Sequence, residues 1–250
     1  MGGLRAVILI LILGGTGEAR GLAAALVGRG VDVVTSLAGV TAVPVLPLGK
    51  IRRGGFGGVD GLAAYLAEAG IGLVADATHP FAVGISRHAG EAAGRRGIPY
   101  VRLERPAWRA GPGDRWQEVA DVAAAVAALA PGATALVTIG RKDLAAFASR
   151  DDLRVIARAI EPPGFALPGK WTLVLARPPF AVEAETALME GHGVSVLVTK
   201  NAGGEATRAK LVAARQLGIP VIMVARPSKP AAETAETVEE MVERIAGRIG

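Results

Sequence analysis

The sequence predicts an α/β protein made of two Rossmann-like, doubly wound halves with parallel sheets and a cleft between them. Its 250 residues suit one large domain or two small ones. The run Val7–Leu13 contains only valine, isoleucine and leucine, which is typical of a strand buried on both faces of a parallel sheet. Strand and helix patterns then alternate, loosen over Pro106–Arg115, and begin again.

In the first half, four strand patterns alternate with three helix patterns, so right-handed crossovers are expected. The expected strands are Val7–Leu13, Val31–Leu37, Ile71–Ala75 and Pro99–Leu103. The first expected helix ends at Gly30, and Leu22, Ala25, Leu26 and Arg29 have helical spacing in it. The second covers Val59–Ala69, after the glycine-rich loop Gly54–Gly58, and the third covers Gly84–Arg96.

The second half repeats this alternation after the boundary. The expected strands are Thr134–Ile139, Leu153–Ile160, Thr172–Ala176, Val194–Thr199 and Val221–Val224. The expected helices are Trp116–Ala130, Asp143–Arg150, Val182–Glu190, Glu205–Leu217 and a final one with the apolar stripe Val238, Met241, Val242, Ile245 and Ile249. We therefore predict an N-terminal domain over residues 1–106 and a C-terminal domain over residues 107–250.

The composition excludes several classes of protein. Cysteine is absent, which excludes disulfide scaffolds, thiol nucleophiles, Fe–S clusters and cysteine-ligated zinc. No two of the histidines His79, His88 and His192 have metal-ligand spacing, so no metal is expected. Aromatic residues are 4% of the chain and no Lys/Arg run exceeds two residues, so no nucleic-acid partner is expected.

Charge and hydropathy favour a cytoplasmic protein that binds anions. The net charge is +5, and a basic protein attracts phosphates and polycarboxylates. No apolar stretch approaches the roughly 18–20 residues that span a bilayer, so no membrane partner is expected. The segment Ala6–Leu13 could mimic a signal peptide, but a buried strand explains it better because a glycine-rich turn follows directly.

The turn after the first strand is the first candidate binding site. Gly14, Gly15, Thr16, Glu18, Ala19 and Arg20 open a helix, whose N-terminal N–H groups attract anions. The alignment of Gly15 and Gly17 with the dinucleotide fingerprint G-x-G-x-x-G puts Arg20 at the third glycine position. Glu18 could cap the helix or bind a ribose, and Arg20 could bind a phosphate or carboxylate. The alternative is a tight turn with a solvated Glu18–Arg20 pair.

The end of the second strand favours NADP over NAD. NAD sites usually carry an acid there that binds the ribose 2′-hydroxyl, but this chain has Ser36 and Ala38. Arg52 and Arg53 lie close by in the sequence. The alternative is that neither arginine faces the ligand.

A polar cluster follows the third strand, at an edge where such sheets bind ligands. It contains Asp76, Thr78, His79 and Pro80. His79 could donate a proton or contact the cofactor, and it could equally cap the next helix.

Basic turns follow three strands of the second half and suit an anionic substrate. One contains Gly140, Arg141, Lys142 and Asp143, and another contains Arg177 before two prolines. The third is glycine-rich and contains Lys200, Asn201 and, further on, Arg208. The alternatives are an ordinary helix start at Asp143 and a plain glycine connection after Lys200.

These turns together resemble the precorrin-6A reductase family of the cobalamin pathway. The matching blocks run over nearly the whole chain and are Gly14-Gly15-Thr16-Gly17-Glu18-Ala19-Arg20, Asp76-Ala77-Thr78-His79-Pro80-Phe81-Ala82, Arg102-Leu103-Glu104-Arg105-Pro106, Ile139-Gly140-Arg141-Lys142, Arg177-Pro178-Pro179-Phe180 and Thr199-Lys200-Asn201-Ala202-Gly203-Gly204. The resemblance implies hydride transfer from NADPH to a ring carbon of precorrin-6A, giving precorrin-6B, without flavin or metal. The run Val155-Ile156-Ala157-Arg158 departs from the family, which is expected to prefer an aromatic residue in place of the valine.

Precorrin-6A is a polycarboxylate tetrapyrrole, which arginine-rich turns would bind through charge-assisted hydrogen bonds. We expect NADPH to contact Gly14, Gly15, Thr16, Glu18, Ala19, Ser36, Ala38, Asp76, Thr78, His79, Pro80, Gly140 and Arg141. We expect the substrate to contact Arg20, Arg177, Lys200, Asn201 and Arg208. The proton that accompanies the hydride could come from Lys142, Asp143 or water.

Two other functions stay open at this point. Another NADP-dependent dehydrogenase of the short-chain type would need a Tyr-x-x-x-Lys pair, and neither Tyr65 nor Tyr100 has a lysine four residues on. A non-enzymatic nucleotide sensor would bind NADP without oxidising a substrate, and it would not need the basic turns of the second half.

Overall fold

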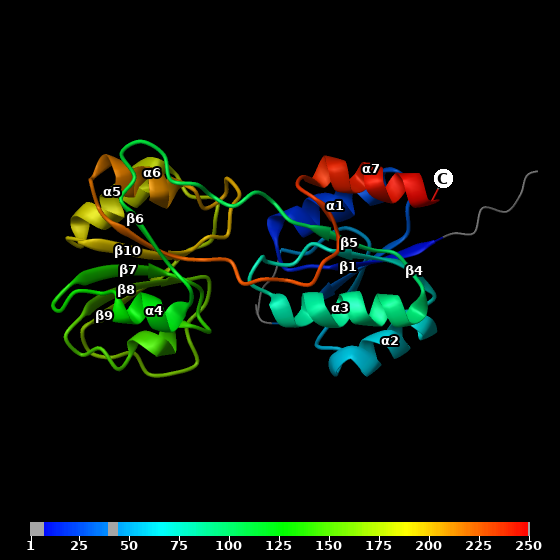
Figure 1. Cartoon of the computed structure of the whole chain (residues 1–250), viewed down its shortest axis with the longest axis horizontal. Helices are drawn as coiled ribbons and strands as arrows, with labels where there is room; N and C mark the ends of the chain where they lie inside the picture. Colours follow the sequence, from blue (N-terminus) through cyan, green and yellow to red (C-terminus); the bar gives the residue numbers. More distant parts are fainter. Residues whose placement is uncertain (1–7, 40–44, 250) are drawn as a thin grey trace, which may run out of the picture. The chain divides into compact units, whose positions relative to one another are not determined.

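The structure is a computed structural model that describes residues 8–39 and 45–249. It divides into two compact units (Figure 1). The first unit joins the residues up to Arg105 with those from Pro227 onward, and the second unit is Pro106–Arg226. Each unit contains a six-stranded parallel sheet, so the predicted fold class of two Rossmann-like halves is confirmed.

The first sheet has the strand order β12-β5-β4-β1-β2-β3. Its strands are β1 (Leu9–Leu13), β2 (Val33–Leu37), β3 (Lys50–Arg53), β4 (Ile71–Asp76), β5 (Tyr100–Leu103) and β12 (Glu233–Ala235). Its helices are α1 (Gly17–Gly28), α2 (Gly58–Glu68), α3 (Val83–Arg96) and α7 (Val238–Ile249). Val7, which the sequence places in the first strand, lies outside the described residues.

Alternation along β1 builds a core on each face of this sheet. Ile10 and Ile12 are fully buried in the cluster that contains residues of α1 and α7. Leu11 and Leu13 are buried on the opposite face, with residues of α2 and α3. Figure 1 shows the two helix pairs on opposite sides of the sheet. The strand is apolar throughout because both of its faces are covered.

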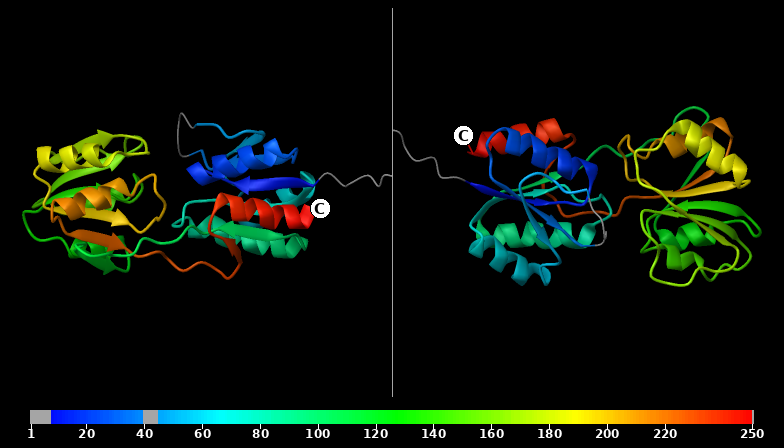
Figure 2. Two further views of the ribbon diagram at one scale, coloured as in Figure 1. Left: turned by 90° about the horizontal axis from the view of Figure 1, so that it is seen from above. Right: turned by 180° about the vertical axis from the view of Figure 1, so that it is seen from behind.

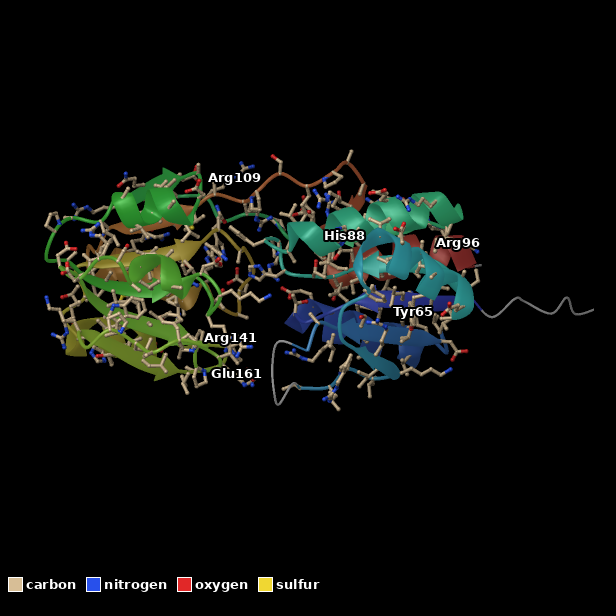
Figure 3. The ribbon with its side chains drawn as sticks, turned by 90° about the horizontal axis from the view of Figure 1, so that it is seen from below. Tyr65, His88, Arg96, Arg109, Arg141 and Glu161 are labelled. Carbon is tan, nitrogen blue, oxygen red and sulfur yellow. The ribbon has the colours of Figure 1, made fainter. Side chains whose placement is uncertain are left out.

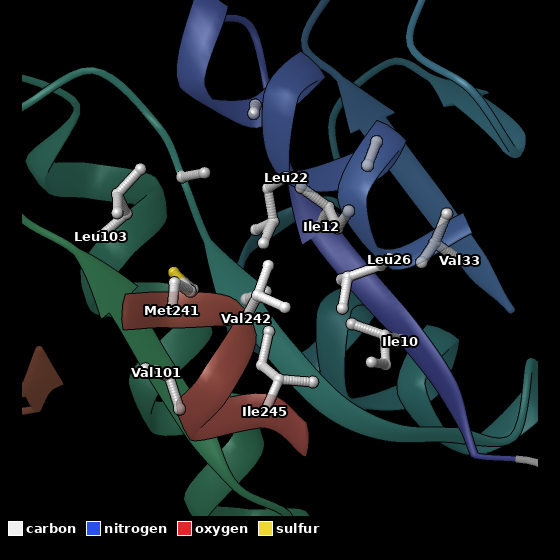
Figure 4. Close-up of a cluster of buried hydrophobic side chains, with 14 of the residues drawn as sticks. Ile10, Ile12, Leu22, Leu26, Val33, Val101, Leu103, Met241, Val242 and Ile245 are labelled. Carbon is white, nitrogen blue, oxygen red and sulfur yellow. The ribbon is translucent and has the colours of Figure 1, made fainter. Parts of the chain in front are cut away.

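The predicted C-terminal domain over residues 107–250 needs a correction. Strand β12 pairs in parallel with β5, and α7 packs against α1, so residues 227–249 belong to the first unit. Met241, Val242 and Ile245 of α7 are buried against Leu22 and its neighbours in the core of that unit (Figure 4). The apolar stripe was recognised in the sequence, but its partner lies more than 200 residues away, beyond any local pattern.

The second sheet has the strand order β6-β11-β10-β7-β8-β9. Its strands are β6 (Trp116–Val119), β7 (Thr134–Thr138), β8 (Arg154–Ala159), β9 (Trp171–Leu175), β10 (Val196–Lys200) and β11 (Val221–Val224). Its helical segments are α4 (Val122–Ala127), the 3-10 turn η1 (Leu144–Phe147), α5 (Val182–Gly191) and α6 (Ala209–Gln216). Helices α5 and α6 cover one face and α4 lies on the other, as the views in Figure 2 also show.

The prediction of one helix over residues 116–130 is wrong. Trp116–Val119 forms β6, which pairs with β11 at the edge of the sheet, and α4 begins only after Asp121. The Asp121 carboxylate accepts a hydrogen bond from Ala124 N at 2.8 Å, which caps α4 and separates it from the strand. The alanines after Asp121 favour helix, and the prediction extended that helix over Trp116–Val119, which are not alanine-rich.

The two edge strands of the first sheet, β3 and β12, were also missed in the sequence. They are four and three residues long, and β3 reads Lys-Ile-Arg-Arg. Edge strands are often short and charged, so they show no apolar periodicity. In the part of the chain that is described, no helix is long and apolar enough to cross a membrane.

Candidate functional site

The turn between β1 and α1 lies where the strand order of the first sheet reverses. Strand β1 pairs with β2 on one side and with β4 on the other, which makes this the topological switch point where such sheets bind ligands. Thr16 is the N-cap of α1, and its Oγ1 accepts a hydrogen bond from Ala19 N at 3.0 Å. The same hydroxyl donates to the carbonyl of Ala77 at 2.7 Å. Thr16 therefore ties the start of α1 to the end of β4.

The two glycines of this turn meet different requirements: Gly14 packs closely on β2, and Gly15 has open space around it. A Cβ atom on Gly14 would lie 2.8 Å from Thr35 Cγ2, so a side chain does not fit there. Gly15 has φ = 108°, in the region that favours glycine. The N-terminus of α1 follows this turn, and helix N-termini attract anionic groups.

The structure corrects the alignment of the fingerprint in this turn. Ala19 is 1% exposed and faces the sheet, whereas Arg20 is exposed. The close contact between helix and strand therefore belongs to Ala19, one residue earlier than expected, and a small residue does stand there. Arg20 Nη1 donates to the carbonyl of Thr16 at 3.3 Å, and Glu18 forms an ion pair with Arg105 at 2.5 Å.

At the end of β2, Ser36 stands beside Arg52 of the neighbouring strand. The two residues are paired in register, and Arg52 Nη1 lies 3.4 Å from Ser36 Oγ. The guanidinium donates to the carbonyls of Gly54 at 2.6 Å and Gly55 at 2.8 Å, and it stacks on the ring of Phe56 at 3.8 Å. Arg52 is half-buried and held in one place, while Ala38 and Arg53 are exposed.

The polar cluster after β4 is anchored by a buried carboxylate. Asp76 is fully buried and accepts hydrogen bonds from Thr78 N at 3.0 Å, Thr78 Oγ1 at 2.6 Å and the Tyr100 hydroxyl at 2.7 Å. Burial and the Asp76 charge raise the pKa of Tyr100. His79 is exposed and its Nδ1 accepts from Phe81 N at 3.3 Å, while Pro80 is buried. Asp76 is thus closed off from solvent, and its carboxylate holds the start of the loop through Thr78.

At the carboxyl edge of the second sheet, one carboxylate lies between two arginines. Arg141 follows β7 and forms an ion pair with Glu161 at 3.0 Å, and Figure 3 shows the two side chains side by side. Arg177, which follows β9, lies 3.8 Å from the other oxygen of Glu161. Gly140 precedes them with φ = 87°. This edge therefore brings together two of the basic residues that the sequence predicted for ligand binding.

A second ion pair at this edge joins the ends of β7 and β10. Lys200 donates a hydrogen bond to the Asp143 carboxylate. Lys142, next to Asp143, is exposed, and so is Arg208, which pairs with Glu205 at 3.1 Å.

Asn201 is buried, and its amide serves the chain itself. Its Oδ1 accepts from Trp108 N at 2.8 Å, and its Nδ2 donates to the carbonyl of Trp108 at 3.0 Å. Asn201 therefore fixes the segment around Trp108, and the geometry favours this positioning role over the direct substrate contact that the sequence predicted.

Three buried charges of the second unit were not singled out in the sequence as site residues. They are Arg158, Glu185 and Lys210. The signal for Arg158 is a lone charge inside the apolar run of β8, and Glu185 and Lys210 stand on the buried faces of short helices. Within residues 8–39 and 45–249, no group of three or more metal-ligating side chains comes together.

The fold and the turn at the switch point define the first unit as a Rossmann-like α/β domain, a class whose ligands bind at the carboxyl ends of the strands. The profile of a protein family described as precorrin-6x reductase CbiJ/CobK matches residues 9–246. The chain therefore belongs to the precorrin-6x reductase family, a family of oxidoreductases of cobalamin biosynthesis.

Known relatives agree with this membership. The precorrin-6A reductase of Rhodococcus erythropolis is 54% identical over 242 residues, which cover 96% of this chain and 95% of that protein. The cobalt-precorrin-6A reductase of Priestia megaterium is 33% identical over 234 residues, which cover 88% of this chain and 91% of that protein. A solved structure of CobK precorrin-6A reductase has a TM-score of 0.91 at 41% identity and covers 96% of both chains.

Proposed function

We propose that this protein reduces precorrin-6A to precorrin-6B in cobalamin biosynthesis, with NADPH as the hydride donor. The observation that carries the proposal is a near-complete match to relatives named precorrin-6A reductase, at up to 54% identity. The relatives named for the cobalt-containing substrate are less similar, at 33% identity or below. This order favours the metal-free substrate.

The first unit is the proposed NADPH-binding part. The turn of Gly14, Gly15 and Thr16 fits the pyrophosphate, because the backbone can approach it closely and α1 points its N-terminus there. Arg52, held beside Ser36, suits the 2′-phosphate that distinguishes NADPH from NADH. Asp76 does not contact NADPH in this proposal. It holds Thr78 and thereby the loop that carries His79.

The second unit is the proposed partner of the substrate carboxylates. Arg141 and Arg177 follow β7 and β9, and Lys200 ends β10. Arginine is suited to binding carboxylates through two hydrogen bonds. In the free protein these cations are held by Glu161 and Asp143, so substrate carboxylates would exchange with those acids. Arg20 and Arg208 are exposed and serve the same substrate in this proposal.

NADPH, when bound, supplies the hydride, and the chain must orient the ring and deliver a proton. Lys142 or Asp143 delivers the proton in this proposal, because both lie in the turn after β7 and Asp143 pairs with Lys200 at the end of β10. The expected cleft between the two halves, the absence of flavin and metal, and the cytoplasmic location stay predictions.

Absorbance spectroscopy tests the proposal. Purified protein is mixed with NADPH and either precorrin-6A or its cobalt complex, and NADPH consumption is followed together with the tetrapyrrole spectrum. We expect stoichiometric oxidation with precorrin-6A. NADPH binding without oxidation would support a nucleotide sensor, and turnover of alcohols or sugars alone would support another dehydrogenase.

A further inference from the structure

Of the described residues in the second unit, three charged ones are buried close to one another. Arg158 on β8 is 6% exposed, Glu185 on α5 is 2% exposed and Lys210 on α6 is 4% exposed. Burying a charge costs free energy unless the charge is paired, and a buried ion pair is often no more stabilising than apolar side chains of similar size. Stability alone therefore does not explain these three charges.

Arg158 connects the buried core to the turn that carries Arg177. It forms an ion pair with Glu185, and its guanidinium lies 4.1 Å from the centre of the Phe180 ring. Phe180 closes the turn over residues 177–180, and its N–H donates to the carbonyl of Ala206 at 3.3 Å. A cation that is paired with Glu185 thus lies over the Phe180 ring.

Lys210 likewise contacts an aromatic ring of a loop, the one that contains Trp108. Its ammonium lies 5.3 Å from the centre of the Trp108 ring, and Trp108 Nε1 donates to the carbonyl of Gly204 at 3.1 Å. Burial, together with the positive charge of Arg158, lowers the pKa of Lys210 to about 7, and Glu185 opposes this shift. Glu185 is thus the one acid among two buried cations, and each cation supports an aromatic ring of a surface segment.

We propose that Arg158 and Glu185 are positioning residues, which hold Phe180 and thereby the turn that presents Arg177 to a carboxylate of the substrate. The identity of that substrate rests on the proposed function. The pair touches no substrate itself. It acts through a cation–ring contact, in which the guanidinium must stay over the Phe180 ring.

The test replaces both charges at once, with Arg158→Met/Glu185→Met. A single replacement would leave one charge buried without its partner and could unfold the chain, whereas an apolar pair keeps the volume. We expect an unchanged or higher Tm, a KM for precorrin-6A raised at least about 5-fold, and a kcat within about 2-fold of the original. We also expect faster hydrogen exchange at the amide of Phe180, whose N–H is bonded to the Ala206 carbonyl.

Two further variants sharpen the result. In an Arg177→Ala background, the double replacement should raise KM no further, because both changes act on one turn. The matched control is the exposed pair Arg95–Glu91 of α3, for which Arg95→Met/Glu91→Met should change neither KM nor exchange at Phe180.

An unchanged KM and unchanged exchange at Phe180 would overturn the inference, as would a loss of Tm and kcat without a change in KM. Hydrogen exchange needs no turnover, so it separates this inference from the proposed function. If the original protein does not oxidise NADPH with precorrin-6A, the proposed function is wrong, while faster exchange at Phe180 still supports the positioning role.

Discussion

Lys200, the last residue of β10, forms an ion pair with Asp143, which stands 57 positions earlier in the chain after β7. These strands are neighbours at the centre of the second sheet, so the pair lies at the point where the strand order reverses. An acid and a cation at such a point are suited to proton delivery and carboxylate binding.

This pair makes a prediction about the separate roles of its members. Asp143→Asn should lower kcat by at least about 10-fold, a barrier increase of about 1.4 kcal/mol, because a carboxylate can take up a proton and pass it on, whereas an amide cannot. Lys200→Met should instead raise KM for precorrin-6A, since a carboxylate partner is lost. Steady-state kinetics of both variants and of the double variant measure the coupling. An Asp143→Asn variant with the original kcat would remove Asp143 from the reaction.

A second prediction concerns Lys142, which is exposed next to Asp143. Lys142→Ala should lower kcat/KM at least about 10-fold, with the affinity for NADPH little changed. Lys142→Arg keeps the charge but is a poor proton donor, so a kcat that stays low in this variant would indicate proton transfer. Recovery of KM in the arginine variant would indicate charge pairing. Unchanged kinetics in the alanine variant would make this turn an ordinary helix start.

A third prediction concerns the choice of cofactor. NADPH should bind at least about 10-fold tighter than NADH, a difference of about 1.4 kcal/mol. Arg52→Ala should reduce this preference because the guanidinium beside Ser36 is lost, and Ser36→Asp should reduce it by repelling the 2′-phosphate. Calorimetric titration with both nucleotides measures the effect. Lys50→Ala, an exposed position on the same strand, is the control. Equal affinities in the original protein would contradict the prediction.

A fourth prediction follows from the buried amine of Lys210. Burial, reinforced by Arg158, lowers its pKa to about 7, whereas in the unfolded chain the pKa is near the ordinary 10.5. Between these values the unfolded chain binds the extra proton, so the free energy of unfolding rises with pH by up to about 1.4 kcal/mol per unit. Below pH 7 both states are protonated, and this contribution no longer changes.

Lys210→Met removes that dependence. The variant should be more stable than the original protein at pH 7, and the difference should shrink toward pH 10. Denaturant unfolding at pH 7, 8, 9 and 10 measures this, with the exposed Lys50→Met as the control. A constant difference across the four values would show that the amine titrates in the folded protein as it does in the unfolded chain.

The sequence predicted the elements that carry a strong local pattern. The apolar runs of β1, β4, β7 and β10 end in polar or glycine-rich turns, and these turns do stand at the carboxyl edges of the two sheets. Parallel sheets give such runs because both faces are buried. The candidate residues Lys200 and Asp143 were predicted separately, and the structure shows that they form a pair.

What escaped prediction depends on contacts between distant segments. Strand β12 has only three residues, and it can be recognised as a strand only from its pairing with β5. The burial of Asp76 and Asn201 depends on Tyr100 and Trp108, which approach from elsewhere in the fold. The sequence patterns predicted both polar residues as ligand-binding residues. They did not show that each side chain would be buried and hydrogen-bonded to a neighbouring segment of the chain.

The return of the chain to its first unit affects the order of folding during synthesis. Residues 106–226 form a continuous unit, which has all its strands once residue 224 has left the ribosome. The first unit must wait for β12 and α7, because Met241, Val242 and Ile245 fill its core. The half that is made first is thus completed last, the reverse of the usual N-terminal-first order. A chain that ends at residue 226 and has been released from the ribosome should resist protease over residues 106–226 and be cleaved within residues 8–105.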